Sequence, residues 1–236
     1  ITDAQGRWAA GPTHLVQTGD VLDRGPDSKK VMDLLMDLEG QATKAGGRVH
    51  SLIGNHEYMT VMGDLRYVSD GELAAFGEGP RGTPVGREPV GTFPAYRAAF
   101  SKEGKYGRWL FGHNAIVKIN GTLFMHGGIS PRYARRNIVE LNDSIRAELR
   151  GEREARLGVG ADPEGPLWFR GLAESLPPET LDSYLTQLFA AQSRNAILAE
   201  RGGEFAPVFS PKQVTAQRTC DAPSQQLAPQ NWHRFR

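Results

Sequence analysis

Three short phrases of this chain carry residue types that bind metals and phosphate. They are residues 19–25 (GDVLDRG), 54–57 (GNHE) and 126–128 (HGG). Together they offer carboxylate, amide and imidazole ligands for hard to borderline divalent metals, and an arginine suited to phosphate. This combination predicts metal-assisted hydrolysis of a phosphate ester.

The first phrase concentrates two carboxylates and a guanidinium on one loop. Asp20 follows a glycine that lets the backbone turn sharply, and its two oxygens suit a carboxylate that bridges two cations. A Gly-Asp pair by itself is typical of a turn, and a surface salt-bridge loop is the alternative interpretation. Asp23 and Arg24 follow at once, and this spacing favours a functional site.

The second and third phrases supply an amide and two imidazoles. Asn55 offers a hard oxygen ligand, and His56 could act as a ligand or as a proton donor to a leaving alkoxide. Asp23 is the candidate that would orient His56; the alternative is a loop histidine bonded to backbone. His126 lies between an apolar strand and two glycines, where its ring can reach a metal. The other histidines are interpreted as packed or solvated: His14, His50, His113 and His233.

Each phrase begins where an apolar run stops, so we expect strands to position all three. The apolar pattern predicts strands over residues 13–18 and 48–53, which end at the first and second phrases. Residues 115–119 and 122–125 read as a hairpin with an Asn-Gly turn that ends at His126. Ligands and substrates of layered α/β folds gather at such strand ends.

The remaining elements follow from apolar spacing. Four residues at i, i+3, i+4 and i+7 predict a helix that starts at Asp27 or Ser28, ends at Gly46 and links the first two strands as a parallel crossover: Val31, Leu34, Leu35 and Leu38. Similar spacing predicts helices over 138–149 and 181–188, and Gly and Pro predict a surface loop over 77–91. We expect a domain over residues 1–192 and a polar, poorly ordered tail over 193–236.

Composition narrows the class of protein. At 236 residues the chain is long enough for one sizeable α/β domain. A formal net charge of +1 gives no field that argues for nucleic acid. The single cysteine, Cys220, excludes an internal disulfide and a thiolate metal cluster. No apolar run approaches the roughly 20 residues of a membrane span, so we expect a soluble protein. Because the first residue is Ile1, the compartment is not readable.

The three phrases resemble motifs of the calcineurin-like metallophosphoesterase superfamily, on its phosphoprotein phosphatase branch. Residues 165–171 (GPLWFRG) further resemble the bacterial-type members called Shewanella-like phosphatases. The resemblance covers roughly residues 13–188, and three ordered motifs at matching strand ends are specific as a set. It implies a four-layer α/β/β/α sandwich that is incomplete at both ends of this chain.

The resemblance also implies roles for individual residues. Asp20 would bridge two divalent metals, Mn, Fe or Zn, and Asn55 and His126 would hold the second one. His56 would protonate the leaving group with Asp23 behind it. The substrate's phosphate would be held by Arg24 and Arg170. A hydroxide between the metals would attack phosphorus in line.

Two family motifs are not found in this sequence. The first, Gly-Asp-x-His-Gly, belongs some tens of residues before Asp20, and the other, a late Gly-His that follows a strand and gives the second metal another histidine, is not found past Leu188. A late start and a frameshift near Gln192 would account for both, which the flanking DNA would test. We therefore expect weak or absent activity from residues 1–236, because losing metal ligands lowers metal affinity.

Three functions remain open from the residues. The first is a phosphatase for phosphomonoesters, either phosphoproteins or small phosphate esters, without distinction between Ser, Thr and Tyr. The second is a phosphodiesterase or nucleotide hydrolase on the same site, although Arg24 favours the free oxygens of a monoester. The third is an inactive domain that keeps only phosphate or partner binding.

Overall fold

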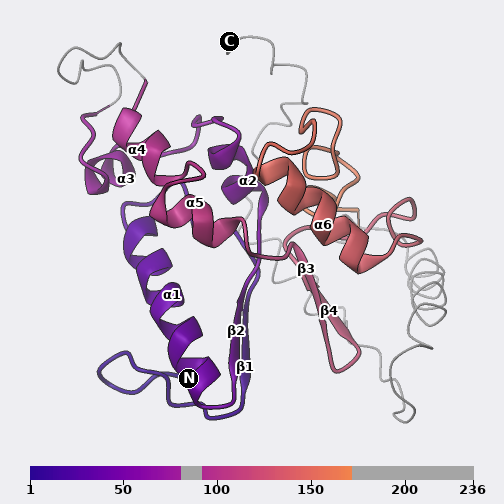
Figure 1. The fold of residues 1–236 in the computed structure, drawn as a ribbon, viewed down its shortest axis with the longest axis horizontal. Coiled ribbons are helices and arrows are strands. Elements are labelled where there is room, and N and C mark those ends of the chain that lie inside the picture. The colour runs from indigo at the N-terminus through magenta and orange to yellow at the C-terminus, as the bar shows by residue number, and fades with distance from the viewer. Residues whose placement is uncertain (81–91, 172–236) are drawn as a thin grey trace.

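The computed structural model describes residues 1–80 and 92–171. Over these residues the chain is a mixed α/β fold (Figure 1). Its elements are β1 (His14–Gln17), α1 (Ser28–Lys44), β2 (Arg48–Ser51), α2 (Asn55–Val61), α3 (Asp70–Ala75), α4 (Pro94–Ala99), α5 (Lys105–Leu110), β3 (Ile116–Ile119), β4 (Thr122–Met125) and α6 (Ile138–Leu149). No helix among them is long and apolar enough to cross a bilayer.

The predicted parallel crossover is confirmed. Strands β1 and β2 pair in parallel, with His14 opposite Arg48 and Gln17 opposite Ser51, and α1 runs alongside them (Figure 1). Because both strands run in the same direction, the loops that follow them emerge at the same end of the sheet. The first two phrases of the sequence therefore meet in space.

Helix α1 buries a different face from the one predicted. Val31 and Leu34 are exposed, and the buried residues are Ser28, Met32, Leu35, Leu38 and Ala42. Two overlapping apolar stripes share Leu35 and Leu38, and periodicity alone cannot choose between them. Leu35, Leu38 and Ala42 pack with Val49 of β2, and Met32 packs in the larger apolar cluster that also contains Tyr106. These tertiary contacts determine which stripe is buried.

The predicted hairpin is confirmed as β3 and β4, an antiparallel pair with Ile119 opposite Thr122. Asn120 and Gly121 join the strands with φ of 49° and 82°. Left-handed φ at both central residues is the backbone that an Asn-Gly hairpin turn requires. The hairpin carries the chain to His126, the start of the third phrase.

The predicted helix over 138–149 is confirmed as α6. The side chain of Asn137 caps it by accepting a hydrogen bond from the backbone N–H of Val139 at 2.8 Å. The predicted helix over 181–188 and the tail over 193–236 lie outside the described residues, as do residues 81–91 of the predicted loop. The domain boundary at 192 stays a prediction.

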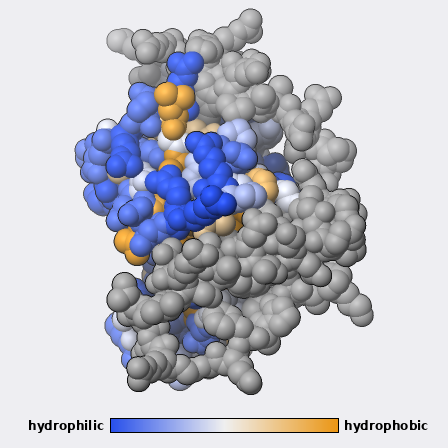
Figure 2. Space-filling model, turned by 90° about the vertical axis from the view of Figure 1, so that its right-hand side faces the viewer, coloured by the Kyte–Doolittle hydropathy of each residue, from blue (hydrophilic) through white to orange (hydrophobic). Residues whose placement is uncertain are grey.

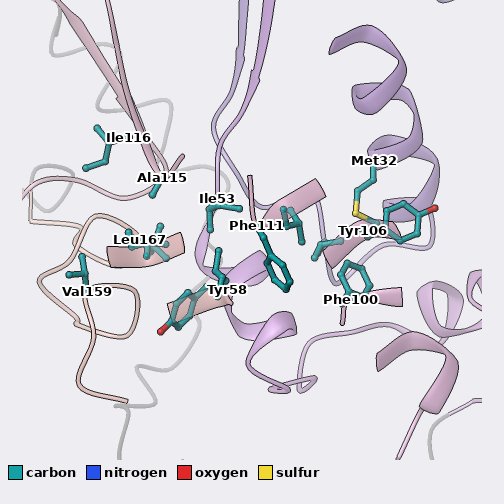
Figure 3. Close-up of a cluster of buried hydrophobic side chains, with 14 of the residues drawn as sticks. Met32, Ile53, Tyr58, Phe100, Tyr106, Phe111, Ala115, Ile116, Val159 and Leu167 are labelled. Carbon is teal, nitrogen blue, oxygen red and sulfur yellow. The ribbon is translucent and has the colours of Figure 1, made fainter. Parts of the chain in front are cut away.

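One large apolar cluster lies behind the strand ends and anchors the second phrase (Figure 3). Ile53 precedes residues 54–57 and Tyr58 follows them, and both side chains are fully buried. Leu167 enters the same cluster from a distant part of the chain. Where described residues reach the surface drawn in Figure 2, most are hydrophilic.

Candidate functional site

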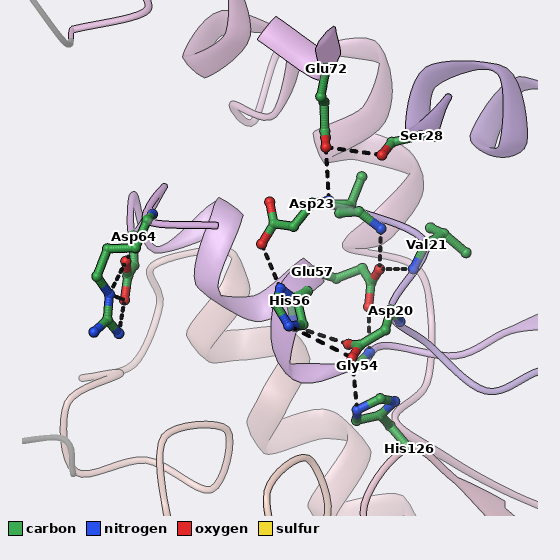
Figure 4. A network of polar contacts seen from close by, with 12 residues as sticks. Asp20, Val21, Asp23, Ser28, Gly54, His56, Glu57, Asp64, Glu72 and His126 are labelled. Carbon is green, nitrogen blue, oxygen red and sulfur yellow. Dashed lines mark hydrogen bonds and ion pairs between the residues drawn. The ribbon is translucent and has the colours of Figure 1, made fainter. Parts of the chain in front are cut away.

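The three phrases converge at the strand ends, with Asp20 at their centre (Figure 4). An Asp20 carboxylate oxygen lies 3.1 Å from Nε2 of His126, and the other carboxylate oxygen accepts the backbone N–H of His56 at 3.2 Å. Burial works to raise the pKa of Asp20, but the hydrogen bond and charge of His126 outweigh it and lower that pKa. The carboxylate therefore stays ionised, as a metal ligand must be.

Glycine allows this close approach of the first two phrases. A Cβ on Gly19 would lie 2.6 Å from the Cα of Gly54 and 3.2 Å from the His126 ring. Gly19 also has a φ of +96°, which side-chain-bearing residues rarely adopt. Asp20, Asp23 and Arg24 follow with φ between 57° and 69°. Such backbone persists only where its surroundings hold it, and it clusters at functional sites.

His56 is held by Asp23 as the sequence suggested. Its Nδ1 lies 2.6 Å from a carboxylate oxygen of Asp23, and its Nε2 faces Asp20 at 3.9 Å. Burial works to lower the pKa of His56, but the Asp23 hydrogen bond and the Asp20 charge overcome it and raise that pKa. The geometry leaves Nε2 as the nitrogen that can pass a proton at the site.

The side chains at the centre of the site carry donor atoms that suit a divalent cation. The side-chain oxygen of Asn55 is buried and has no hydrogen-bond partner among the residues that the structure describes. His126 directs Nδ1 at the carbonyl of Thr18, 3.1 Å away, so in the neutral imidazole that a metal requires, Nε2 is the nitrogen left to bind the cation. One carboxylate, one amide and one imidazole suit a hard to borderline cation.

Asp20, Asn55 and His126 are the candidate ligands for one cation. The described part of the chain contains no cluster of three or more His, Cys, Asp or Glu side chains able to hold a metal. Of the two predicted metals, the first therefore has only the bridging Asp20 as a predicted ligand within residues 1–80 and 92–171. The prediction of a dimetal centre is supported here only by family membership, described below.

The two arginines that are predicted to hold the phosphate, Arg24 and Arg170, occupy different positions. Arg170 lies beside one of the candidate metal ligands, with Nη2 3.0 Å from Nε2 of His126. Its segment packs on Gly127, whose N–H donates to the carbonyl of Pro166 at 2.8 Å. Arg24 is exposed on the loop of Asp20, and its guanidinium carbon lies 5.4 Å from the centre of the Tyr67 ring.

Glu57 is a functional candidate that residue-by-residue reasoning missed. It is 1% exposed and accepts four backbone N–H groups from residues 20, 21, 22 and 54 at 2.7–3.3 Å (Figure 4). Burial and the Asp20 charge raise its pKa, while the N–H groups oppose that shift. Glu57 thus ties the Asp20 loop to the helix of Asn55 and His56. The sequence signal was a glutamate three residues after the N-cap of a helix.

Glu72 is a second buried carboxylate that the sequence did not reveal. It accepts the backbone N–H of Asp23 at 2.8 Å, the Ser28 hydroxyl at 3.0 Å and the Tyr96 hydroxyl at 2.8 Å. Burial raises its pKa to about 7. Glu72 supports the loop behind Asp23. Like Glu57 it lies three residues after a helix N-cap, Ser69, but that local signal does not indicate its contact with the distant Asp23.

A carboxylate-held imidazole beside candidate cation ligands and an arginine suits chemistry on a phosphate ester. The family model described as calcineurin-like phosphoesterase matches residues 6–188. The chain belongs to this family, whose members typically bind a dimetal centre.

Relatives agree with this family. The chain is 38% identical over 176 residues to an uncharacterized protein of Schizosaccharomyces pombe, which covers 71% of this chain and 49% of that protein. It is 27% identical over 208 residues to Shewanella-like protein phosphatase 2 of Arabidopsis thaliana, which covers 75% and 53%. The chain therefore spans about half the length of these relatives.

A solved structure shows the same fold. The cold-active protein-tyrosine phosphatase of a psychrophilic Shewanella species superposes with a TM-score of 0.62 at 32% identity. The match covers 83% of this chain and 56% of that one. The predicted metallophosphoesterase fold is confirmed to this extent, and the completeness of its four layers stays a prediction.

Proposed function

We propose that this chain is a metal-dependent phosphatase that hydrolyses phosphomonoesters, on phosphoproteins or on small phosphate esters. The observation that carries the proposal is the His56–Asp23 pair, 2.6 Å apart, beside the cation-binding set of Asp20 and His126. A proton donor next to a cation site is the minimal equipment for expelling an alkoxide or phenoxide from phosphorus.

Each side chain has a role that its contacts support. Asp20, Asn55 and His126 would hold a divalent cation, Mn, Fe or Zn, which supplies Lewis acidity toward a phosphate oxygen when bound. His56 donates the proton on Nε2 to the leaving oxygen as the P–O ester bond breaks. Asp23 keeps the opposite nitrogen protonated, so that the imidazolium stays charged and correctly oriented until the transfer.

The arginines favour a monoester over a diester. A monoester offers three terminal oxygens, which suit guanidinium groups that donate in pairs. Arg170 lies 3.0 Å from His126. When a phosphate binds at the cation, the Arg170 guanidinium would exchange its contact with His126 for a contact with a phosphate oxygen. Arg24 would approach from the loop of Asp20.

The substrate itself is proposed only as a class. One similar protein is a protein-tyrosine phosphatase and another is a Shewanella-like protein phosphatase, which supports a phosphoprotein substrate. Because this chain spans about half the length of those proteins, their activities are proposed for it. Phosphoserine, phosphothreonine and phosphotyrosine are all retained.

The test compares esters and variants in one experiment. Purified residues 1–236 with Mn²⁺ are assayed on an aryl phosphomonoester and the matching diester, and phosphate binding is measured by calorimetry, since we expect slow turnover. We expect monoester hydrolysis to exceed diester hydrolysis and to fall about 100-fold in His56→Asn.

His113→Asn is the matched control, because His113 contacts Glu39 at 3.4 Å and none of the site residues named above. It should leave the rate unchanged. Faster diester cleavage would favour a phosphodiesterase instead. Phosphate binding without any hydrolysis would favour the inactive domain.

A further inference from the structure

Tyr67 lies between two residues of the candidate site. Its ring meets the His56 ring edge-on, with centroids 5.3 Å apart and an interplanar angle of 62°. Its backbone carbonyl accepts the N–H of Arg24 at 2.9 Å, and the Arg24 guanidinium carbon lies 5.4 Å from the ring centre. Tyr67 therefore contacts Arg24 through both its backbone and its side chain.

Arg24 needs such support because its backbone does not hold its side chain in place. Its φ is 57°, and it is exposed at the turn of the loop that carries Asp20 and Asp23. Within residues 1–80 and 92–171 it forms no ion pair with a carboxylate. An aromatic face attracts a guanidinium without neutralising its charge. Arg24 thus keeps its donors and its charge available for an anion.

Arg66 provides a contrast on the same ring. Its guanidinium carbon lies 5.7 Å from the Tyr67 centre, but its Nε and Nη2 donate to the two carboxylate oxygens of Asp64 at 2.8 and 2.7 Å (Figure 4). The Asp64 carboxylate occupies the fork that would otherwise meet a phosphate. Of the two arginines on this ring, Arg24 is the one whose fork is open among the described residues.

We propose that Tyr67 is a positioning residue that holds the Arg24 guanidinium ready for the substrate's phosphate, an inference that rests on the proposed function. The ring and the carbonyl of Tyr67 fix where the exposed arginine lies before the anion arrives. Less side-chain freedom is then lost on binding. His56 depends less on Tyr67, because Asp23 holds it through a 2.6 Å hydrogen bond.

The experiment is a double-mutant cycle on phosphate binding, which does not require turnover. The dissociation constant of inorganic phosphate is measured by calorimetry with Mn²⁺ for the wild type, Tyr67→Leu, Arg24→Ala and the double variant. We expect Tyr67→Leu to weaken binding about 5-fold, or about 1 kcal/mol at 1.4 kcal/mol per factor of ten. In the Arg24→Ala background the same change should have no further effect.

Three further variants sharpen the cycle. Tyr67→Phe keeps the aromatic face and should bind phosphate within 2-fold of the wild type. Arg66→Ala removes the other cation on the ring and should leave the constant unchanged. Tyr67→Met replaces Tyr67→Leu if leucine unfolds the protein, with the same expectation.

The outcomes separate this inference from the proposed function. An equal loss from Tyr67→Leu with and without Arg24 would overturn the inference, because the ring would then act elsewhere. A shifted pH–rate profile in Tyr67→Leu would overturn it too, by showing that the ring acts through His56. A wild type that binds phosphate but hydrolyses no ester refutes the proposed function, while the binding cycle still decides the role of Tyr67. A wild type that binds no phosphate refutes both.

Discussion

Replacing Glu57 with glutamine should lower the free energy of unfolding substantially, although the substitution exchanges only one carboxylate oxygen for an amide nitrogen. The Glu57 carboxylate is buried, and every contact that it makes there is with a backbone N–H donor. One oxygen accepts from Asp20 and Gly54 at 2.8 and 2.7 Å, and the other accepts from Val21 and Leu22 at 2.8 and 3.3 Å. An amide would put an NH₂ donor where one of these oxygens now accepts.

The size of the effect follows from counting donors. Whichever way the amide of Glu57→Gln turns, two backbone N–H groups lose their acceptor and face another donor. A buried unsatisfied donor costs about 1–3 kcal/mol, so the expected loss in unfolding free energy is about 2–6 kcal/mol, centred on about 4. Native domains are stable by only about 5–15 kcal/mol, and such a loss is a large share of that total.

Urea denaturation measures this loss directly. With a slope of about 2 kcal/mol per M, the midpoint of Glu57→Gln should fall by about 2 M with the slope unchanged. Glu140→Gln is the matched control, because Glu140 is exposed on α6 and should move the midpoint hardly at all. A midpoint for Glu57→Gln within about 0.3 M of the wild type would refute the reasoning that these four bonds hold the loops together.

Three other outcomes are expected. Glu72 has its pKa raised from 4.5 to about 7, so its own contribution to the unfolding free energy should be complete below pH 4.5 and fall by about 3 kcal/mol as the pH rises through 7; the difference between wild type and Glu72→Gln in urea midpoints at pH 5 and pH 8 measures this contribution. Asp23→Asn should lower the pKa of His56, seen by NMR, and reduce turnover about 10–100-fold; an unchanged His56 pKa would contradict the assigned pair. Gly19→Ala should lower the melting temperature by several degrees in a thermal scan, because its Cβ would lie 2.6 Å from Gly54 on a backbone with φ of +96°; Gly6→Ala, with a φ of +76° and open space around it, separates the clash from the strain.

Much of the fold was predictable because its signals are local. The parallel pair, the helix between its strands and the Asn-Gly hairpin each follow from apolar periodicity and turn chemistry within a short segment. The buried face of α1 was not predictable in this way. Val31 and Leu34 are as apolar as the residues that pack, and the tertiary contacts decide which stripe is covered: Val49 on β2 beside Leu35 and Leu38, and the large apolar cluster around Met32.

The residues of the candidate site also fall into two groups: those that the sequence predicts, and those that only the folded structure identifies. Asp20, Asn55, His56 and His126 could be predicted because a metal and a proton transfer demand particular elements: a carboxylate, an amide oxygen and imidazole nitrogens. Their spacing to strand ends then indicated that they meet. The structure brings these four together, and their roles remain predictions.

Glu57 and Glu72, which support the site from behind, meet a different requirement, and this is why they were not predicted from the sequence. What Asp20 and Asp23 need behind them is an acceptor for backbone N–H groups at one point in space, and any element that reaches that point can supply it. Glu57 supplies it from the next phrase, and Glu72 from a helix 49 residues beyond Asp23. A loop held in left-handed backbone must satisfy those N–H groups when it is buried, because water cannot. The backbone of residues 20–24 therefore requires buried acceptors, but only the folded chain determines which residues they are.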